Sequence, residues 1–166
     1  QFGTVGAIDR LRTFSEPTTG PDAAPTSSSD AEVVSVALAA TDPANPYGAA
    51  LPWPERSSAE EGGAGHRPGR KAGALVVIVD GRLVLYVERG GKTLLTFSDD
   101  PQLLGLAARS LADAAARGAL GRMTVEKADG EPLLGSGTTP LRTALTEAGF
   151  VSTPRGLRLH PGPGRR

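Results

Sequence analysis

Cationic side chains gather at two places in the chain, and both are predicted to be loops. One is the run His66-Arg67-Pro68-Gly69-Arg70-Lys71, and the other is the pair Gly90-Gly91 with Arg89 and Lys92 on either side. Basic loop tips suit a nucleic-acid backbone, because each cation can neutralise a phosphate. We therefore predict nucleic-acid contacts from Arg67, Arg70, Lys71, Arg89 and Lys92. Solubilising surface charge is the alternative interpretation.

A proline-rich segment, residues 40–54, carries the one tryptophan and one of the two tyrosines, and we call it the strap. Its four prolines exclude a helix or a central strand. Tyr47 and Trp53 are predicted to hold the strap on a core, and a base-stacking platform is the alternative. Asp42 precedes Pro43 and is predicted to form an Asx turn. A role for Asp42 as a general base is the alternative, and it is the local catalytic candidate.

Several chemistries have no support in the residues. There is no cysteine, and His66 and His160 have no metal-ligand spacing, so no metal site is predicted. The run Gly90-Gly91-Lys92-Thr93 lies between two predicted strands and lacks the upstream glycine of a phosphate-binding loop. No apolar run is long enough to cross a membrane and no signal peptide is visible, so a cytoplasmic location is expected.

The charge is unevenly distributed although the chain is neutral overall. Residues 1–61 have a balance of −6 and residues 62–166 a balance of +6. A basic second half could face nucleic acid, and a solvated surface is again the alternative.

The apolar pattern predicts an antiparallel meander in the middle of the chain. Short apolar runs at 74–79, 82–88 and 93–97 are separated by Asp80-Gly81 and Gly90-Gly91. Asp-Gly indicates a two-residue hairpin, because a type I′ turn needs positive φ at both central positions. In 82–88 the alternation of Leu83, Leu85 and Val87 with the other residues predicts one core face and one mixed face, as in a half-open sheet or small barrel.

The flanking segments complete an α+β domain with a mostly antiparallel, small β-barrel-like sheet and two helices. A short helix at 5–14 and a flexible linker at 15–31 precede it. The helix at 101–117 is expected to start at Asp99-Asp100-Pro101, with Asp as the cap and Pro in the first turn. The predicted elements are a strand at 32–40, the meander, a helix at 101–117, a strand at 123–127, a turn at Asp129-Gly130, a helix at 139–148 and a hairpin from 151–152 and 156–159.

Four sequence blocks resemble the C-terminal region of the actinobacterial Lhr (large helicase-related) family. They are ATDPANPYGAALPWPE, GHRPGRKAGALVVIVDGRLVLYVERGGKTLLTF, RGALGRMTVEKADGEPLL and LTEAGFVSTPRGLRL. The resemblance runs from about residue 2 to residue 160, with the blocks in the family's order. It implies that 1–14 ends a preceding winged-helix module, 15–31 is a linker, 32–160 is the β-barrel-like C-terminal module with a disordered loop at 55–73, and 161–166 is a tail.

The resemblance also implies a function for the parent protein. The family has a superfamily 2 ATPase core, using ATP and Mg²⁺, that translocates 3′ to 5′ on single-stranded DNA and unwinds DNA and RNA:DNA hybrids. Its C-terminal region has tandem winged helices, resembles AlkZ-type DNA glycosylases and is implicated in oligomers. Some relatives have uracil-DNA glycosylase activity.

The chain departs from these patterns at the sites of catalysis. It lacks the ATPase motifs, and neither Gln1 nor Gln102 starts the Gln-x-Gln or Gln-x-Asp signature of the AlkZ-type enzymes. The tail GLRLHPGPGRR has no aspartate. Our first hypothesis is therefore a non-catalytic, DNA-binding accessory module of a DNA-repair helicase, with no cofactor of its own and with the upstream modules as partners.

Two alternatives remain open. The module could complete a glycosylase site, with Tyr47 and Trp53 lining a pocket and Asp42 as the local carboxylate. It could instead form a homo-oligomer through the sheet and the helix at 101–117. Arg109, Asp113 and Arg117, at i, i+4 and i+8, predict a solvated outer stripe on that helix.

Overall fold

A computed structural model describes the second of two compact units, which divide at Glu32 and Val33. The predicted helix at 5–14, the linker at 15–31, both histidines and the tail at 161–166 lie outside the described residues. The described ranges are 33–55, 67–118, 123–135 and 139–159.

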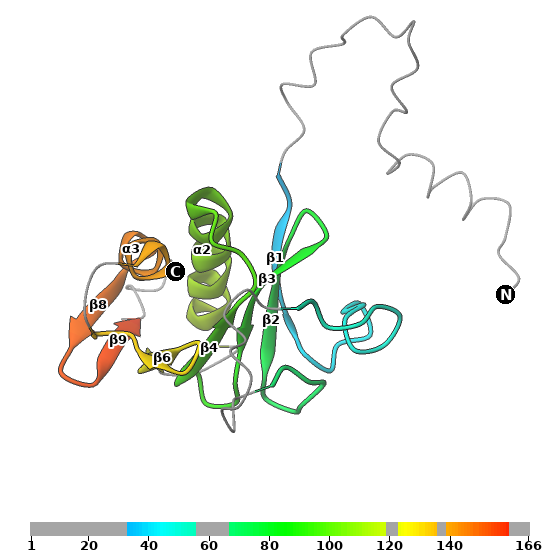
Figure 1. The fold of residues 1–166 in the computed structure, drawn as a ribbon, viewed down its shortest axis with the longest axis horizontal. Coiled ribbons are helices and arrows are strands. Elements are labelled where there is room, and N and C mark those ends of the chain that lie inside the picture. The colour runs from blue at the N-terminus through cyan, green and yellow to red at the C-terminus, as the bar shows by residue number, and fades with distance from the viewer. Residues whose placement is uncertain (1–32, 56–66, 119–122, 136–138, 160–166) are drawn as a thin grey trace, which may run out of the picture. The chain divides into compact units, whose positions relative to one another are not determined.

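The predicted meander is confirmed (Figure 1). The three predicted runs form β2 (Leu75–Val79), β3 (Arg82–Val87) and β4 (Thr93–Thr96), and the predicted strand at 32–40 forms β1 (Ser35–Ala39) next to β2. Each strand pairs antiparallel with the next. The turn between β2 and β3 has φ of 46° at Asp80 and 77° at Gly81, as the Asp-Gly signal requires.

The register of the meander shifts where β2 meets β3. Val77 lies opposite Leu85 and Ile78 opposite Leu83, so Val84 is an extra residue on β3. Its carbonyl oxygen accepts a hydrogen bond from the Phe97 amide. A bulge reverses the side-chain alternation, and Leu83 therefore faces the opposite side of the sheet from Leu85. The prediction that 82–88 has one core face and one mixed face is wrong, because both faces of β3 are buried.

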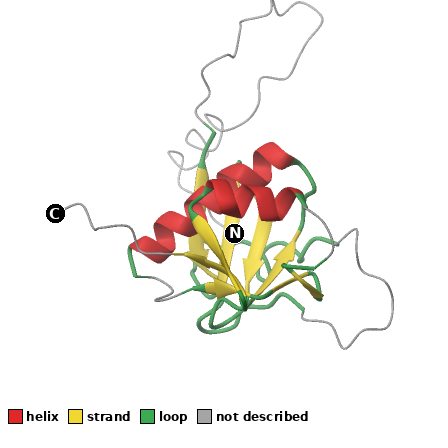
Figure 2. Cartoon of the chain, turned by 90° about the vertical axis from the view of Figure 1, so that its left-hand side faces the viewer, coloured by secondary structure: helices red, strands yellow, loops and turns green. Residues whose placement is uncertain are grey.

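Different segments cover the two faces of the meander. The helix α2 (Pro101–Ala116) packs on one face, where its Leu104, Ala107 and Leu111 join a large buried cluster. The strap packs on the other face through Ala40, Tyr47 and Trp53. Figure 2 shows the helices together on one side of the strands. The predicted cap is present, because Asp100 accepts a hydrogen bond from the Gln102 amide at 2.8 Å.

The second half of the module forms short strands and one more helix. The elements are β5 (Thr124–Val125), β6 (Lys127–Ala128), β7 (Glu131–Pro132), α3 (Pro140–Glu147), β8 (Phe150–Thr153) and β9 (Gly156–Leu159). The predicted single strand at 123–127 divides at Glu126, because the amides of Glu126 and Lys127 both donate to the carbonyl oxygen of Lys92. This turns the chain from a three-stranded sheet, β5-β9-β8, into the larger sheet.

The α+β class is confirmed, but the sheet does not close into a barrel. The large sheet has the order β1-β2-β3-β4-β6-β7, so β1 and β7 stand at its two ends. Closure needs tilted strands that stay paired around the full circle. Here β6 and β7 have two residues each, and β5, β8 and β9 pair separately. One pairing, β4 with β6, is parallel within the otherwise antiparallel sheet.

Candidate nucleic-acid interface and an adjoining pocket

The guanidinium of Arg70 ties the strap to the loop before β2. Its Nη1 donates to the carbonyl oxygen of Asn45 at 2.8 Å and lies 3.4 Å from that of Tyr47. Its Nη2 donates to the carbonyl oxygens of Asp42 at 3.0 Å and Thr41 at 3.2 Å. Both terminal nitrogens therefore point at backbone acceptors. These hydrogen bonds give Arg70 a structural role, and Arg70 is therefore left out of the candidate interface.

The two strap aromatics lie against the sheet. Tyr47 is 8% exposed, and its hydroxyl donates to Gly81 O and accepts from Leu83 N. Trp53 stacks on Tyr47 with 6.3 Å between ring centroids and meets Tyr86 edge to face at 5.7 Å. These contacts favour the predicted strap role over a stacking platform, because the ring faces are occupied by other rings.

Asp42 lies within a turn of the strap. Its Oδ1 accepts a hydrogen bond from the Ala44 amide at 2.8 Å, which is the predicted Asx turn. Its backbone carbonyl accepts from Arg70 and from the Asn45 amide. This carboxylate therefore has a structural use, and it does not line the pocket described below.

The structure brings three of the predicted cationic residues together. Residues 67–73, expected to belong to a disordered loop, form defined turns, with Ala74 N donating to Lys71 O. Lys71 Nζ donates to the carbonyl oxygen of Arg67 at 3.1 Å. A Cβ built on Gly73 would lie 3.1 Å from Cγ of Arg89, so the Arg89 stem covers this glycine. Arg67, Lys71 and Arg89 are therefore neighbours on two loops.

Two further cations lie at the same end of the sheet. The starts of β2, β4 and β6 and the end of β3 share one end, because β4 is antiparallel to β3 and parallel to β6. Lys92 directly precedes β4, and Lys127 lies opposite Thr93. Lys92 Nζ is 3.4 Å from Glu126 Oε1, with 71% of the Lys92 side chain exposed. We call Arg67, Lys71, Arg89, Lys92 and Lys127 the basic edge.

Sequence reasoning missed Lys127. Its place beside Lys92 depends on the parallel pairing of β4 with β6, which joins segments more than thirty residues apart. Such pairing carries no local sequence signal. A mixed-charge segment such as Glu126-Lys127-Ala128-Asp129 could equally be a solvated strand.

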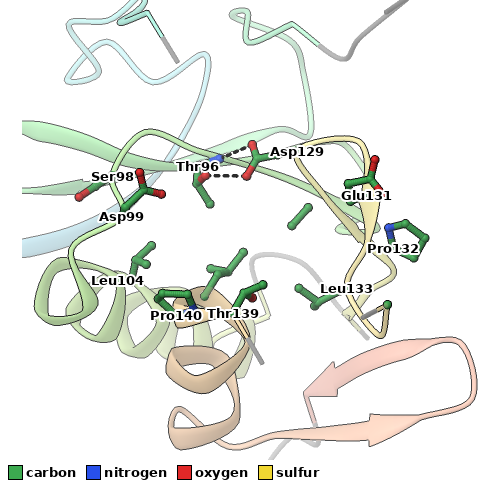
Figure 3. A pocket seen from close by; sticks show the side chains of 13 residues that line it. Thr96, Ser98, Asp99, Leu104, Asp129, Glu131, Pro132, Leu133, Thr139 and Pro140 are labelled. Carbon is green, nitrogen blue, oxygen red and sulfur yellow. Dashed lines mark hydrogen bonds between the residues drawn. The ribbon is translucent and has the colours of Figure 1, made fainter. Parts of the chain in front are cut away.

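A pocket of about 410 Å³ opens at the other end of β4 (Figure 3). Buried Leu104, Leu133 and Leu141 contribute apolar walls. Its polar lining residues are Thr96, Ser98, Asp99, Asp129, Glu131 and Thr139. Asp129 accepts from the Thr96 amide at 2.9 Å and from the Thr96 hydroxyl at 2.5 Å, which fixes the β6–β7 turn to the end of β4. Among the described residues that line the pocket, none is basic.

The buried hydroxyl of Tyr86 is a further group whose environment affects its chemistry. Burial raises the pKa of the Tyr86 hydroxyl above its ordinary value, and the negative charge of Glu88 raises it further. Within the described ranges, no group of three or more histidine, cysteine or acidic residues could hold a metal ion. In the same part of the chain, no helix has the length and apolar character of a membrane span.

Comparison with known proteins gives two matches that cover nearly the whole chain. The chain is 44% identical over 163 residues to a Mycolicibacterium smegmatis protein described as "Lhr helicase/ probable uracil glycosylase", covering 96% of the chain. It is 37% identical over 158 residues to the Escherichia coli "Lhr helicase/uracil glycosylase", covering 95% of the chain. No protein-family model matches.

Identities of 44% and 37% over nearly the whole chain show the family to which it belongs. The chain belongs to the Lhr family, and it is consistent with a C-terminal Lhr-type module. It spans only 10% and 9% of the lengths of the two relatives.

Proposed function

We propose that this chain is the DNA-contacting accessory module of an Lhr-type DNA-repair helicase. The observation that carries the proposal is the basic edge, where the Arg89 stem lies on Gly73 beside Lys71 and Arg67. Cations on neighbouring loops can follow the phosphates of one strand, and release of condensed counterions then drives binding. The names of both relatives include a helicase, which supports DNA as the partner.

The parent protein would supply the motor. In this proposal an upstream ATPase core, using ATP and Mg²⁺, moves 3′ to 5′ along single-stranded DNA and unwinds DNA or RNA:DNA hybrids. The module holds the strand or places the upstream modules, and it does not hydrolyse ATP. Its partners are single-stranded DNA and the preceding modules of the same chain.

A glycosylase role is the second candidate, because both relatives' names include uracil glycosylase. The strap residues give it little support, since Asp42 holds a turn and Trp53 packs on Tyr47 and Tyr86. An oligomerisation role for α2 also has little support. Its outer residues Arg109, Asp113 and Arg117 are all exposed, as a solvated stripe predicts.

Fluorescence anisotropy of a labelled single-stranded oligonucleotide tests the DNA-binding proposal. Titrations of the 166-residue chain at about 50 and 200 mM salt give the slope of log affinity against log salt. The magnitude of this slope should fall by about 0.7 for each phosphate that the protein no longer neutralises. The variant Arg67→Gln/Lys71→Gln/Arg89→Gln should therefore reduce the slope by about 2 and bind more weakly.

The matched control is Arg82→Gln/Arg109→Gln/Arg117→Gln. It removes the same charge from three exposed arginines that are not members of the basic edge. We expect it to keep most of the salt slope. Equal reductions in the two variants, or no binding by the unaltered chain, would overturn the proposal.

A further inference from the structure

The proposed DNA binding by the basic edge does not involve the pocket at the far end of β4. Its volume of about 410 Å³ is within the range of sites for small ligands. Figure 3 shows Asp99, Asp129 and Glu131 along one side of this space, and Leu104, Leu133 and Pro140 along the other together with Thr139. A ligand that fits both walls needs a compact apolar body and hydrogen-bonding groups on one edge.

The polar wall includes the hydroxyls of Ser98 and Thr139, and its charged groups are all acceptors. Asp99 and Glu131 are exposed at the pocket, and their carboxylates have no hydrogen bond or ion pair in the part of the chain that the structure describes. An ionised carboxylate only accepts hydrogen bonds. The ligand edge that faces this wall must therefore donate N–H groups.

The apolar wall consists of buried side chains on which a flat ring can pack. Leu104, Leu133 and Leu141 are between 2% and 6% exposed, and they belong to the cluster that holds α2 and α3 on the sheet. The opposite wall is also fixed, because Asp129 binds both the amide and the hydroxyl of Thr96. The pocket is thus held by the same packing that holds the domain together.

Two strands connect the pocket to the basic edge. β4 runs from Thr93, next to Lys92, to Thr96 at the pocket, and β6 runs alongside from Lys127. Three residues of strand span about 10 Å. A base of a single strand that is bound at Lys92 and Lys127 is therefore within reach of the pocket, because unstacked bases can turn away from the backbone.

We propose that this pocket binds an unpaired nucleobase with an exocyclic amino group, such as cytosine. Cytosine presents an N4 amino donor that Asp and Glu accept, whereas uracil presents the O4 acceptor at the same position. The carboxylates Asp99 and Glu131 would accept from the amino group while the ring lies on the leucines. This inference rests on the proposed DNA binding, and it adds a base preference that the basic edge alone cannot give.

The test compares deoxycytidine and deoxyuridine tracts of equal length, which carry the same phosphates and differ at positions 3 and 4 of the ring. Cytosine has an acceptor nitrogen and an amino group there, and uracil has an N–H group and a carbonyl oxygen. Anisotropy titrations of the 166-residue chain should show binding about three- to tenfold tighter to the cytidine tract, as expected for a hydrogen bond to a charged group at a partly exposed site. A denaturing gel after hot alkali, which cleaves DNA at abasic sites, checks that the bases stay attached during each titration.

Two variants with the same change in charge identify the source of the preference. Asp99→Asn/Glu131→Gln replaces the pocket carboxylates with amides that also donate, so the preference should fall to equality or reverse. Asp113→Asn/Glu147→Gln changes two exposed carboxylates away from the pocket and should keep it. Both variants should keep the salt slope of the unaltered chain, because the basic edge is intact.

The outcomes separate this inference from the proposed function. Salt-dependent binding with equal affinity for the two tracts, or with a preference for uridine, would overturn the base pocket and leave the DNA-binding module in place. A preference that both variants keep would also overturn it. A chain that binds neither tract would overturn both proposals.

Discussion

Gly48 lies directly against the indole ring of Trp53. A Cβ atom built on Gly48 would stand 2.6 Å from Nε1 of Trp53 and 2.8 Å from two of its ring carbons. Gly48 also has φ of 74°, in the left-handed region that favours glycine. The strap thus closes around its tryptophan only because the residue at position 48 has no side chain.

Gly48→Ala should therefore destabilise the module strongly. A left-handed alanine costs about 1–2 kcal/mol, and displacing a packed ring adds about 1–3 kcal/mol. We expect the free energy of unfolding to fall by about 2–5 kcal/mol, measured by urea unfolding with far-UV circular dichroism.

Gly90→Ala is the matched control for this prediction. Gly90 has φ of 86°, but nothing lies within 4 Å of a Cβ built there. The decrease in its stability should be limited to the backbone cost of about 1–2 kcal/mol. If the two variants are destabilised equally, the contact with Trp53 does not constrain the strap.

Arg70→Ala should destabilise the module rather than only weaken DNA binding. The guanidinium donates to strap carbonyls, of which that of buried Asn45 is the closest, at 2.8 Å. Hydrogen bonds to charged groups contribute about 1.5–3 kcal/mol each, and the contributions of neighbouring bonds do not add fully. We expect a decrease of about 2–3 kcal/mol in the same urea assay, with little recovery in Arg70→Lys, because an ammonium lacks the planar fork.

Arg82→Ala provides the comparison for Arg70. Arg82 is exposed at the start of β3, and its replacement should change stability by less than about 0.5 kcal/mol. A stable Arg70→Ala variant that fails to bind DNA would contradict the structural role and return Arg70 to the predicted interface.

The features that the sequence predicts well are those with local causes. The turn at Asp80-Gly81 follows from the need for positive φ, and the start of α2 follows from the Asp100 cap and Pro101. The bulge at Val84 has no such signal. It depends on Ile78 pairing with Leu83, so that large side chains reach both the α2 face and the strap face.

Parts of the candidate site also follow from local sequence features, and other parts do not. Loop composition pointed to Arg67, Lys71, Arg89 and Lys92, but the same composition also included Arg70, whose donors reach the strap from across the loop. The pocket could not be predicted, because its lining comes from β4, the β6–β7 turn and the starts of two helices. Only tertiary packing brings those segments together.

Lys127 and Glu126 should have opposite effects on the binding of DNA at the basic edge. Lys127→Gln should weaken binding of single-stranded DNA and lower the salt slope by about 0.7, the value for one neutralised phosphate. Glu126→Gln frees Lys92 from its ion pair and removes a negative charge, so it should tighten binding. Stability should change by less than about 1 kcal/mol, because exposed ion pairs contribute little. Weaker binding by Glu126→Gln would show that Glu126 orients Lys92 for DNA rather than competing with it.

Tyr86 should make stability depend on pH in the alkaline range. Its hydroxyl donates to Gly69 O at 3.0 Å, and burial raises its pKa in the folded state above the ordinary value of 10.0. A raised pKa means that the neutral hydroxyl stabilises the fold fully below pH 10, and that this stabilisation is lost as the pH rises from there through the folded-state pKa. Tyr86→Phe keeps the ring against Trp53 but removes the titrating group.

The difference in unfolding free energy between the unaltered chain and Tyr86→Phe isolates this effect, because every other titratable group is common to the two proteins. At about pH 8 the unaltered chain should be more stable by about 1 kcal/mol, the typical net contribution of a hydrogen bond. Urea titrations between about pH 8 and pH 11.5 should show this advantage shrinking as the pH rises above the pKa of free tyrosine, because the unfolded chain loses its Tyr86 proton first. A difference that stays constant over this range would mean that the environment of Tyr86 does not favour the neutral hydroxyl, and a difference that grows would mean that the fold favours the phenolate.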